Sequence, residues 1–308
     1  MKFSLFIRYR ITSLFLTLFM IALISGCDSC GNKKITDGEN GGDAILDPDK
    51  DQTLLLQGEK VMFSVPSPVQ TTMLIKQTGA SYNENILNNP KSVSKYGSNF
   101  QKSLNLGAYG ADLGYAIIYD QSQEALLYLN SIKKLADDLG MSGVFDLKGV
   151  KKLEQNIEFK DSLLRMNADL YRDCNGYLKT NHQEDIGLLI LAGGWLEGIY
   201  FSSEVLKDSP VQELRNRIGE QKNTLKNLIK SLSQYQQKIP ELPAFIGQLK
   251  ELAAIFEDIK VVYTFKPSTH DAANKTTTVN SVSKVVITEE QVQAITKKVN
   301  QIRNQIVA

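Results

Sequence analysis

Two stretches of this chain are rich in glycine and almost free of charge. Residues 104–119 contain Asp112 as their only charged side chain, and residues 186–201 contain only Glu197. A helix that is apolar on all sides has to lie inside a protein, and no proline falls between residues 91 and 209 to interrupt one. We therefore predict an all-α, multi-helix bundle with these two stretches as its buried central helices.

The glycines of the two stretches allow two interpretations. Each glycine inside a helix costs about 1 kcal/mol relative to alanine, so tertiary contacts have to compensate for them. In the first interpretation, the missing side chains let the two helices pack closer than the usual distance of about 8–10 Å. In the second, glycines and aromatic rings line a ligand pocket. The candidate pocket residues are Asp112, Glu197, Tyr115, Tyr119, Trp195, Gly194 and Gly198.

The two isolated acids, Asp112 and Glu197, also allow two interpretations, a functional role and a structural role. A carboxylate without a partner in an apolar bundle has a raised pKa, which is typical of groups in general acid or base catalysis. In a purely structural role, tyrosine hydroxyls or cations from neighbouring helices would satisfy both acids. The cations considered are Lys133, Lys134, Arg165 and Arg172. We find no other catalytic motif near the acids, and no catalytic residue is assigned.

Apolar positions at helical spacing predict further helices. One covers residues 125–139, begins behind a capping-box pattern from Asp120 to Gln123, and ends at Gly140. Two more cover about 148–158 and 160–180.

The C-terminal third follows a different pattern. After Ser209 and Pro210, read as N-cap and first turn, a narrow apolar stripe predicts a long, exposed, coiled-coil-like helix from Val211 to Ile239. An antiparallel return covers 245–259, and a last helix covers 292–306 behind a capping box from Thr288 to Gln291. The β-branched runs 261–265 and 276–287 predict a β-hairpin or an extended arm. The helix at 211–239 carries six cations against two acids, which is typical of a solvated face or of a surface that rests on anionic head groups.

The N-terminus predicts export. Residues 1–10 contain three cations, residues 11–24 are apolar, and Ile24-Ser25-Gly26-Cys27 follows. The apolar run is shorter than the roughly 20 residues of a membrane-spanning helix, which favours a signal peptide over a retained anchor. The ending resembles the lipobox of bacterial lipoproteins, and this resemblance implies that Cys27 becomes the lipidated N-terminus. Removal of residues 1–26 would change the net charge from +1 to −2.

These features divide the chain into four parts. Residues 1–26 form the signal peptide, 27–53 a lipidated flexible tether, 54–209 the central bundle, and 210–308 a helical hairpin, a β-like arm and a C-terminal helix packed on the bundle. The tether has no acidic run directly after Cys27. By resemblance to surface-exported lipoproteins, this predicts a body that faces the periplasm from the outer membrane.

The remaining composition limits the partners. A near balance of 35 Lys+Arg and 34 Asp+Glu argues against nucleic acid, and two cysteines with His182 and His270 at these spacings predict no metal site and no cofactor. Cys30 and Cys174 could form a disulfide in an oxidising compartment, but the apolar stripe around Cys174 favours a core cysteine.

Two segments suggest a family for the body. Residues 106–113 (LGAYGADL) and 192–198 (AGGWLEG) are similar to uncharacterised helical lipoproteins of the Bacteroidetes type. The resemblance implies the same fold over most of residues 60–308 and transfers no activity. We therefore expect a lipid-anchored envelope protein that acts as a binding or interaction module for an envelope protein or a small ligand. The alternative is an enzyme or small-ligand binder that uses Asp112 and Glu197.

Overall fold

The computed structural model describes residues 54–58, 61–65, 67–142, 176–208, 210–271, 276–278 and 280–308. The chain divides into two units, residues 1–45 and 46–308, and every described residue belongs to the second. Several predictions therefore lie outside the described residues. They are the signal peptide, Cys27 and its tether, the helix at 148–158, most of the helix at 160–180, Arg165 and Arg172, and the pair Cys30 and Cys174.

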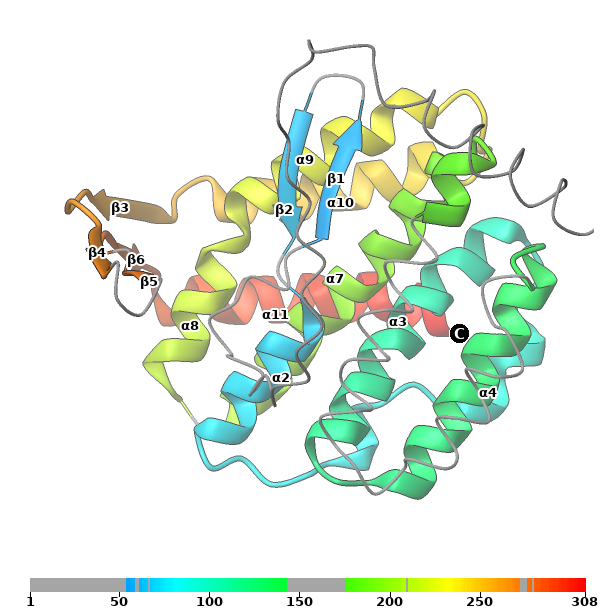
Figure 1. Ribbon diagram of the computed structural model, residues 1–308, viewed down its shortest axis with the longest axis horizontal. Coiled ribbons are helices and arrows are strands. Elements are labelled where there is room, and N and C mark those ends of the chain that lie inside the picture. Colours follow the sequence, from blue (N-terminus) through cyan, green and yellow to red (C-terminus); the bar gives the residue numbers. More distant parts are fainter. Residues whose placement is uncertain are drawn as a thin grey trace, which may run out of the picture. The chain divides into compact units, whose positions relative to one another are not determined.

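The second unit is a helical bundle with small two-stranded antiparallel sheets, which confirms the predicted fold class. Its centre is the helix pair α3 (Asn99–Ile118) and α7 (Glu184–Asp208), which lie side by side (Figure 1). Helix α2 (Pro68–Gln77) contacts both, α4 (Ser122–Asp138) packs on α3, and α11 (Glu289–Val307) packs on α7.

The two central helices are buried as their composition predicts. Helix α3 starts at a complete capping box between Ser98 and Gln101, and every residue from Ser103 to Ile118 is buried. Helix α7 is buried without interruption from Leu188 to Ser203. It is long and apolar enough to cross a membrane, but 89% of its apolar window is covered by the rest of the protein. This burial is typical of a core helix.

Helix α4 confirms one predicted boundary and corrects the other. After α4, Gly140 has a positive φ of 78°, and the amides of Gly140 and Met141 bond back to the last turn, which is a Schellman C-cap. The predicted capping box at Asp120 is wrong. Asp120 adopts a left-handed φ of 62° and its carboxylate pairs with Lys76, so the helix begins at Ser122 without a side-chain cap.

The predicted long helix at 211–239 is divided and partly buried. It consists of α8 (Gln212–Gly219), α9 (Gln221–Leu232) and the short η3 (Ser233–Tyr235), and α10 (Leu242–Phe256) packs along α9. Pro210 does not form its first turn, because α8 starts at Gln212 with Val211 as N-cap and no side-chain cap, and Ser209 lies outside the described residues. Its apolar stripe lies in the hydrophobic core, so only the polar side of this segment is exposed. The buried stripe residues are Leu214, Ile218, Leu225, Leu228 and Leu232.

The strands form hairpins. β3 (Lys260–Thr264) pairs antiparallel with β6 (Val282–Val286). Between them in the sequence, β4 (Thr269–Asp271) pairs antiparallel with β5 (Thr276–Thr278). This confirms the predicted hairpin. A second antiparallel pair, β1 (Leu54–Gly58) with β2 (Val61–Val65), was not predicted, although both runs are rich in apolar residues. Two short 3₁₀ segments, η1 (Glu84–Ile86) and η2 (Pro90–Lys95), connect α2 to α3.

Candidate functional site

The predicted acid Glu197 lies inside the bundle in an ion pair with Arg303. The Nε of Arg303 donates to both carboxylate oxygens of Glu197 at 3.1 and 3.0 Å, and its Nη2 donates to one of them at 2.7 Å. The carboxylate is 1% exposed and the guanidinium 8%. Burial raises the pKa of Glu197, the guanidinium opposes that rise, and the carboxylate in turn raises the pKa of Arg303. A bidentate, charge-assisted pair of this kind fixes α7 and α11 to each other.

The second predicted acid, Asp112, lies near this pair and forms no ion pair with a cation of the described residues. Its Oδ2 accepts the backbone N–H of Asn88 at 3.3 Å, and its buried Oδ1 has no hydrogen-bond partner among the described residues. Burial raises the pKa of Asp112 well above its usual range, the negative charge of Glu197 raises it further, and Arg303 opposes the rise. Among the described residues one guanidinium faces both carboxylates and bonds only to Glu197, so the environment of Asp112 favours its protonated form.

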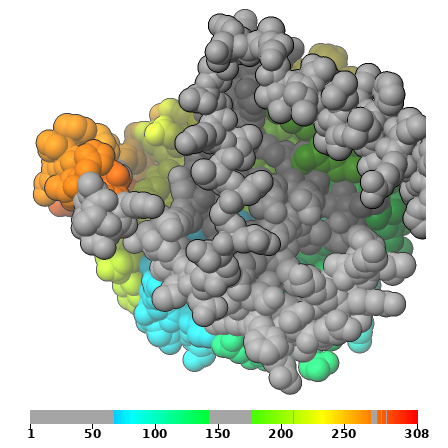
Figure 2. Space-filling view, in the orientation of Figure 1, coloured from blue at the N-terminus to red at the C-terminus, as the bar shows by residue number. Residues whose placement is uncertain are grey.

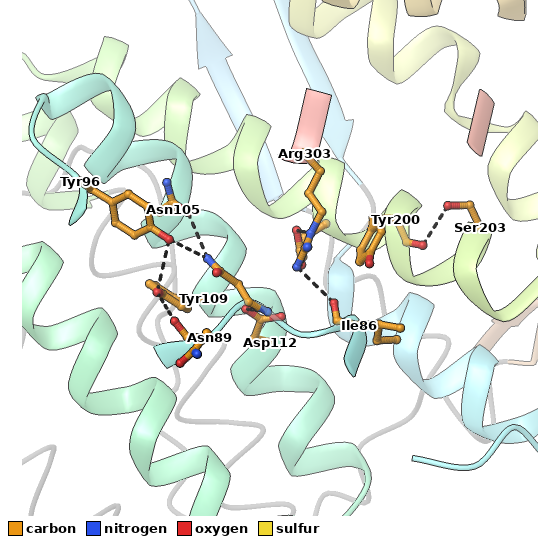
Figure 3. Close-up of polar contacts among 11 residues, drawn as sticks. Ile86, Asn89, Tyr96, Asn105, Tyr109, Asp112, Tyr200, Ser203 and Arg303 are labelled. Carbon is orange, nitrogen blue, oxygen red and sulfur yellow. Dashed lines mark hydrogen bonds and ion pairs between the residues drawn. The ribbon is translucent and has the colours of Figure 1, made fainter. Parts of the chain in front are cut away.

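A network of hydrogen bonds extends from the acids to the segment between α2 and α3 (Figure 3). Arg303 donates to the carbonyl of Ile86 at 3.1 Å and stacks over the Tyr200 ring at 4.1 Å. The side-chain amide of Asn88 donates to Tyr96 and Asn105, each at 3.1 Å. Asn105 in turn donates to the carbonyl of Ile306 at 2.8 Å, and Tyr109 donates to that of Asn89 at 2.8 Å. The network therefore joins α3, α7 and α11 through residues 86–96.

Helices α3 and α7 meet at Gly107 and Gly193, and we call this contact the glycine seam. The seam is closed where the two backbones meet. A Cβ added to Gly107 would lie 1.8 Å from the carbonyl oxygen of Ile190, and one added to Gly193 would lie 1.9 Å from that of Leu104. No side chain fits at either distance, so these two glycines serve close helix packing. Of the two interpretations of the seam, close packing holds at these positions.

The predicted aromatic pocket residues Tyr115 and Tyr119 form part of a separate ring cluster. Their centroids are 4.8 Å apart, and Tyr115 also packs against Phe201 at 5.0 Å. The Tyr119 hydroxyl donates to the carbonyl of Ala80 at 2.8 Å, and the Tyr115 hydroxyl accepts the amide of Asn83 at 3.3 Å. These rings fill the core and hold the chain after α2.

Trp195, Gly194 and Gly198 lie at a third place, beside a cavity of about 10 Å³ that α2 and α8 also line. The Trp195 indole N–H donates to Gln221 at 3.1 Å, and the buried Nε of Arg217 has no partner among the described residues. A space of this size holds about one water molecule. A larger, open groove of about 520 Å³ lies between α7 and α11. Neither cavity is lined by Asp112 or Glu197.

The two described cations suggested as partners for the acids pair elsewhere, and the observed partner of Glu197 was missed. Lys133 pairs with Asp137, and Lys134 pairs with Asp138. Arg303 was not considered because it lies 106 residues from Glu197. It could have been found on the last apolar stripe, since a residue four positions after the buried Val299 has to face the core as well.

The basic residues of the segment 211–239 are largely paired. Five of its six cations lie within 4 Å of an acid, namely Arg215 with Glu289, Arg217 with Glu220, Lys222 and Lys226 with Glu257, and Lys238 with Asp185. Because the five cations share four acids, the excess positive charge of this face is small and its attraction to anionic head groups is weak. Of the two interpretations of this segment, the pairing favours a solvated face over a surface that rests on anionic head groups.

The most exposed apolar surface belongs to the β3–β6 ribbon, which we define as residues 260–286. Six of the seven exposed large hydrophobic side chains among the described residues lie on it, and the seventh is Leu127 on α4. The six are Val261, Val262, Tyr263, Phe265, Val282 and Val286. The ribbon extends from the α8 side of the bundle and is drawn in orange in Figures 1 and 2. Among the described residues, exposed large apolar side chains are therefore concentrated on this ribbon.

Two further observations bear on the site. No group of three or more His, Cys, Asp or Glu that could hold a metal occurs within the described part of the chain. No protein-family model, curated protein or solved structure matches this chain. The site therefore has to be interpreted from its own geometry.

Proposed function

We propose that this protein is a lipid-anchored cell-envelope protein whose body acts as an interaction module, and that the β3–β6 ribbon is its contact surface. The observation that carries the proposal is the concentration of exposed apolar side chains on this one excursion, with Tyr263 63% and Phe265 72% exposed. Large rings at such positions are the usual anchors of protein interfaces. The anchor and its periplasm-facing orientation rest on the lipobox at Cys27 and on the sequence that follows it.

The alternative of an enzyme at Asp112 and Glu197 has less support. Asp112 is 0% exposed and Glu197 is 1% exposed, so a substrate has no access to either carboxyl group. Glu197 is already held by Arg303, and the seam between the helices that carry the two acids is closed at Gly107 and Gly193. These features favour a structural role for both acids.

The base of the β3–β6 ribbon is fixed to the bundle, as a contact surface requires. Val285 is buried, and its Cγ1 lies 2.3 Å from the position that a Cβ on Gly219 of α8 would occupy. Lys222 donates to the carbonyl of Ile259 at 3.1 Å, directly before β3. The base is thus fixed to the bundle while the apolar residues further along remain uncovered.

The test is the size of the assembly in mild detergent extracts of cells that express the full chain. We expect the wild-type protein to sediment as a larger species than Tyr263→Ser/Phe265→Ser. The matched control is Leu127→Ser, which removes an apolar side chain of similar exposure from α4 and should sediment as wild type. Identical sedimentation of all three proteins would overturn the proposal.

A further inference from the structure

No third strand of the described residues pairs with the β3–β6 ribbon. It is a two-stranded sheet within the described residues, and all five residues of β3 are exposed. Such a ribbon is marginally stable in water, and its outer edges present unpaired backbone N–H and C=O groups. A third strand would satisfy one of these edges.

The two strands differ in where their single lysine stands. β6 has Lys284 at its central position, whereas β3 has Lys260 at its first position and is uncharged from Val261 to Thr264. Natural sheets protect exposed edges with lysine, because a charged side chain there discourages pairing with another strand. β3 is therefore the edge that is left open for pairing.

We propose that a second copy of this chain pairs with this edge, with the two β3 strands antiparallel across a two-fold axis at Val262. The inference rests on the proposed function, since it names the partner of the same ribbon. In the register that pairs all five residues, Val262 lies opposite its copy, Lys260 opposite Thr264, and Val261 opposite Tyr263. No like charges meet, and aromatic rings meet β-branched residues, which stabilises cross-strand pairs.

The other edge does not allow the same pairing. If two β6 strands paired about their centre, Lys284 would lie directly opposite Lys284 of the second copy. Like charges in this position destabilise a sheet. Pairing through β3 gives a four-stranded sheet in the order β6–β3–β3–β6, which has enough strands for independent stability.

A second copy also fits the ribbon better than a membrane surface. Exposed apolar side chains lie on both faces of β3, with Val261 and Tyr263 on one face and Val262 on the other. A bilayer would cover one face only, whereas added strands supply cross-strand neighbours on both. The far end of the ribbon, β4 and β5, is built of threonine, histidine and aspartate, which do not enter a bilayer readily. Lipid anchors would hold the copies on one surface and so raise their effective concentration.

The test is disulfide cross-linking of the full chain in cells treated with an oxidant. The background carries Cys30→Ser and Cys174→Ser and keeps Cys27 for lipidation. Directly opposed residues in antiparallel strands have Cα atoms about 4.5–5.5 Å apart, within the range of a disulfide. We expect Val262→Cys to give a reducible band of twice the chain mass, at least tenfold stronger than Lys284→Cys or Leu127→Cys. Cells that express a Val261→Cys copy with a Tyr263→Cys copy should give the mixed dimer.

The outcomes separate this inference from the proposed function. Equal weak bands at positions 262, 284 and 127, together with no mixed dimer, would overturn the self-pairing. If Tyr263→Ser/Phe265→Ser still reduces the assembly size in that case, the ribbon binds a different protein and the interaction module stands. If the assembly size is unchanged as well, both proposals fail. A strong band at Lys284→Cys alone would overturn the assignment of the β3 edge.

Discussion

Arg303 and Glu197 are 106 residues apart in the sequence and meet in a bidentate ion pair inside the bundle, with Arg303 Nη2 2.7 Å from Glu197 Oε1. The pair joins the C-terminal helix α11 to the central helix α7. Removal of one member of such a pair leaves the other charge buried without a partner, which is more costly than the pair itself is stabilising. The stability of the whole bundle therefore depends on this contact.

Replacement of the cation tests this dependence. We expect Arg303→Met to lower the free energy of unfolding by about 3–5 kcal/mol, because Glu197 loses both its charge partner and its hydrogen bonds. Chemical denaturation of the full chain in detergent measures the change. Lys207→Met is the control, since Lys207 pairs with Glu204 at the surface and should change stability by less than about 1 kcal/mol. Equal effects of the two substitutions would contradict a structural role for the buried pair.

The double variant Glu197→Leu/Arg303→Met gives a second measure of the same pair. It removes both charges at once, so no unpaired ion is left in the core. We expect it to recover at least half of the stability that Arg303→Met loses. The losses of unfolding free energy are compared with those of the single variants Glu197→Leu and Arg303→Met. A loss in the double variant that is larger than the sum of the two single losses would show that the pair has a role beyond charge neutralisation.

Asp112 gives the protein a predictable dependence on pH. Its raised pKa means that the folded protein keeps a proton that the unfolded chain releases above its ordinary pKa of about 4. The stabilisation that comes from Asp112 is fully present below the unfolded pKa of about 4. It is lost as the pH rises through the raised pKa of Asp112 in the folded state. The side chain of Asp112→Asn has no charge at any pH, so this variant does not lose that stability. The melting temperature of the variant minus that of wild type should therefore increase from pH 4 to pH 8. A constant difference across this range would show that Asp112 is not held in its protonated form.

The glycine seam predicts opposite effects of two alanine substitutions. Gly193→Ala places a methyl group against the carbonyl of Leu104 and should destabilise the fold by at least about 2 kcal/mol. Gly247→Ala in α10 meets no atom within 4 Å and should stabilise it by about 0.5–1 kcal/mol. Thermal or chemical denaturation compares both with wild type. If Gly193→Ala is as stable as Gly247→Ala, the central helices are not in backbone contact.

The lipid anchor is tested by metabolic labelling with a fatty acid. We expect wild-type protein to incorporate the label, and Cys27→Ala to remain an unlabelled precursor with its first 26 residues attached. Cys30→Ser is the matched control, because it removes a neighbouring cysteine that the lipobox does not use and should be labelled normally. Equal labelling of Cys27→Ala and wild type would contradict the assignment of the anchor.

The central helices were predictable from sequence because their signal is local. A run with one charge in sixteen residues predicts a buried helix, whereas the glycines left close packing and a pocket open until the structure showed backbone contact at Gly107 and Gly193. The same holds for the last helix, whose capping box at Thr288 is observed. Local patterns were less reliable at helix starts. At Asp120, a pairing with Lys76 and a left-handed backbone replace the expected cap.

The candidate site was only partly predictable because it depends on contacts between distant segments. Asp112 and Glu197 could be singled out as isolated acids, but their environment depends on Arg303 and Asn88, which lie in other elements. The seven candidate pocket residues turned out to belong to three different places. The exposed ribbon was predicted as a hairpin, and its exposure could not be predicted, because a β-branched run is equally compatible with a buried strand.

The central claim is that the ribbon is a contact surface that is covered in the cell, and hydroxyl-radical footprinting of the wild-type chain tests it most directly. The measured quantity is the oxidation rate of Tyr263 and Phe265 relative to that of Leu127, which is 53% exposed on α4 and serves as an internal reference. We predict that this ratio is at least fivefold lower in cell envelopes than in the purified chain at high dilution, because a partner covers the ribbon only in the envelope. The same ratio in both samples would contradict the account.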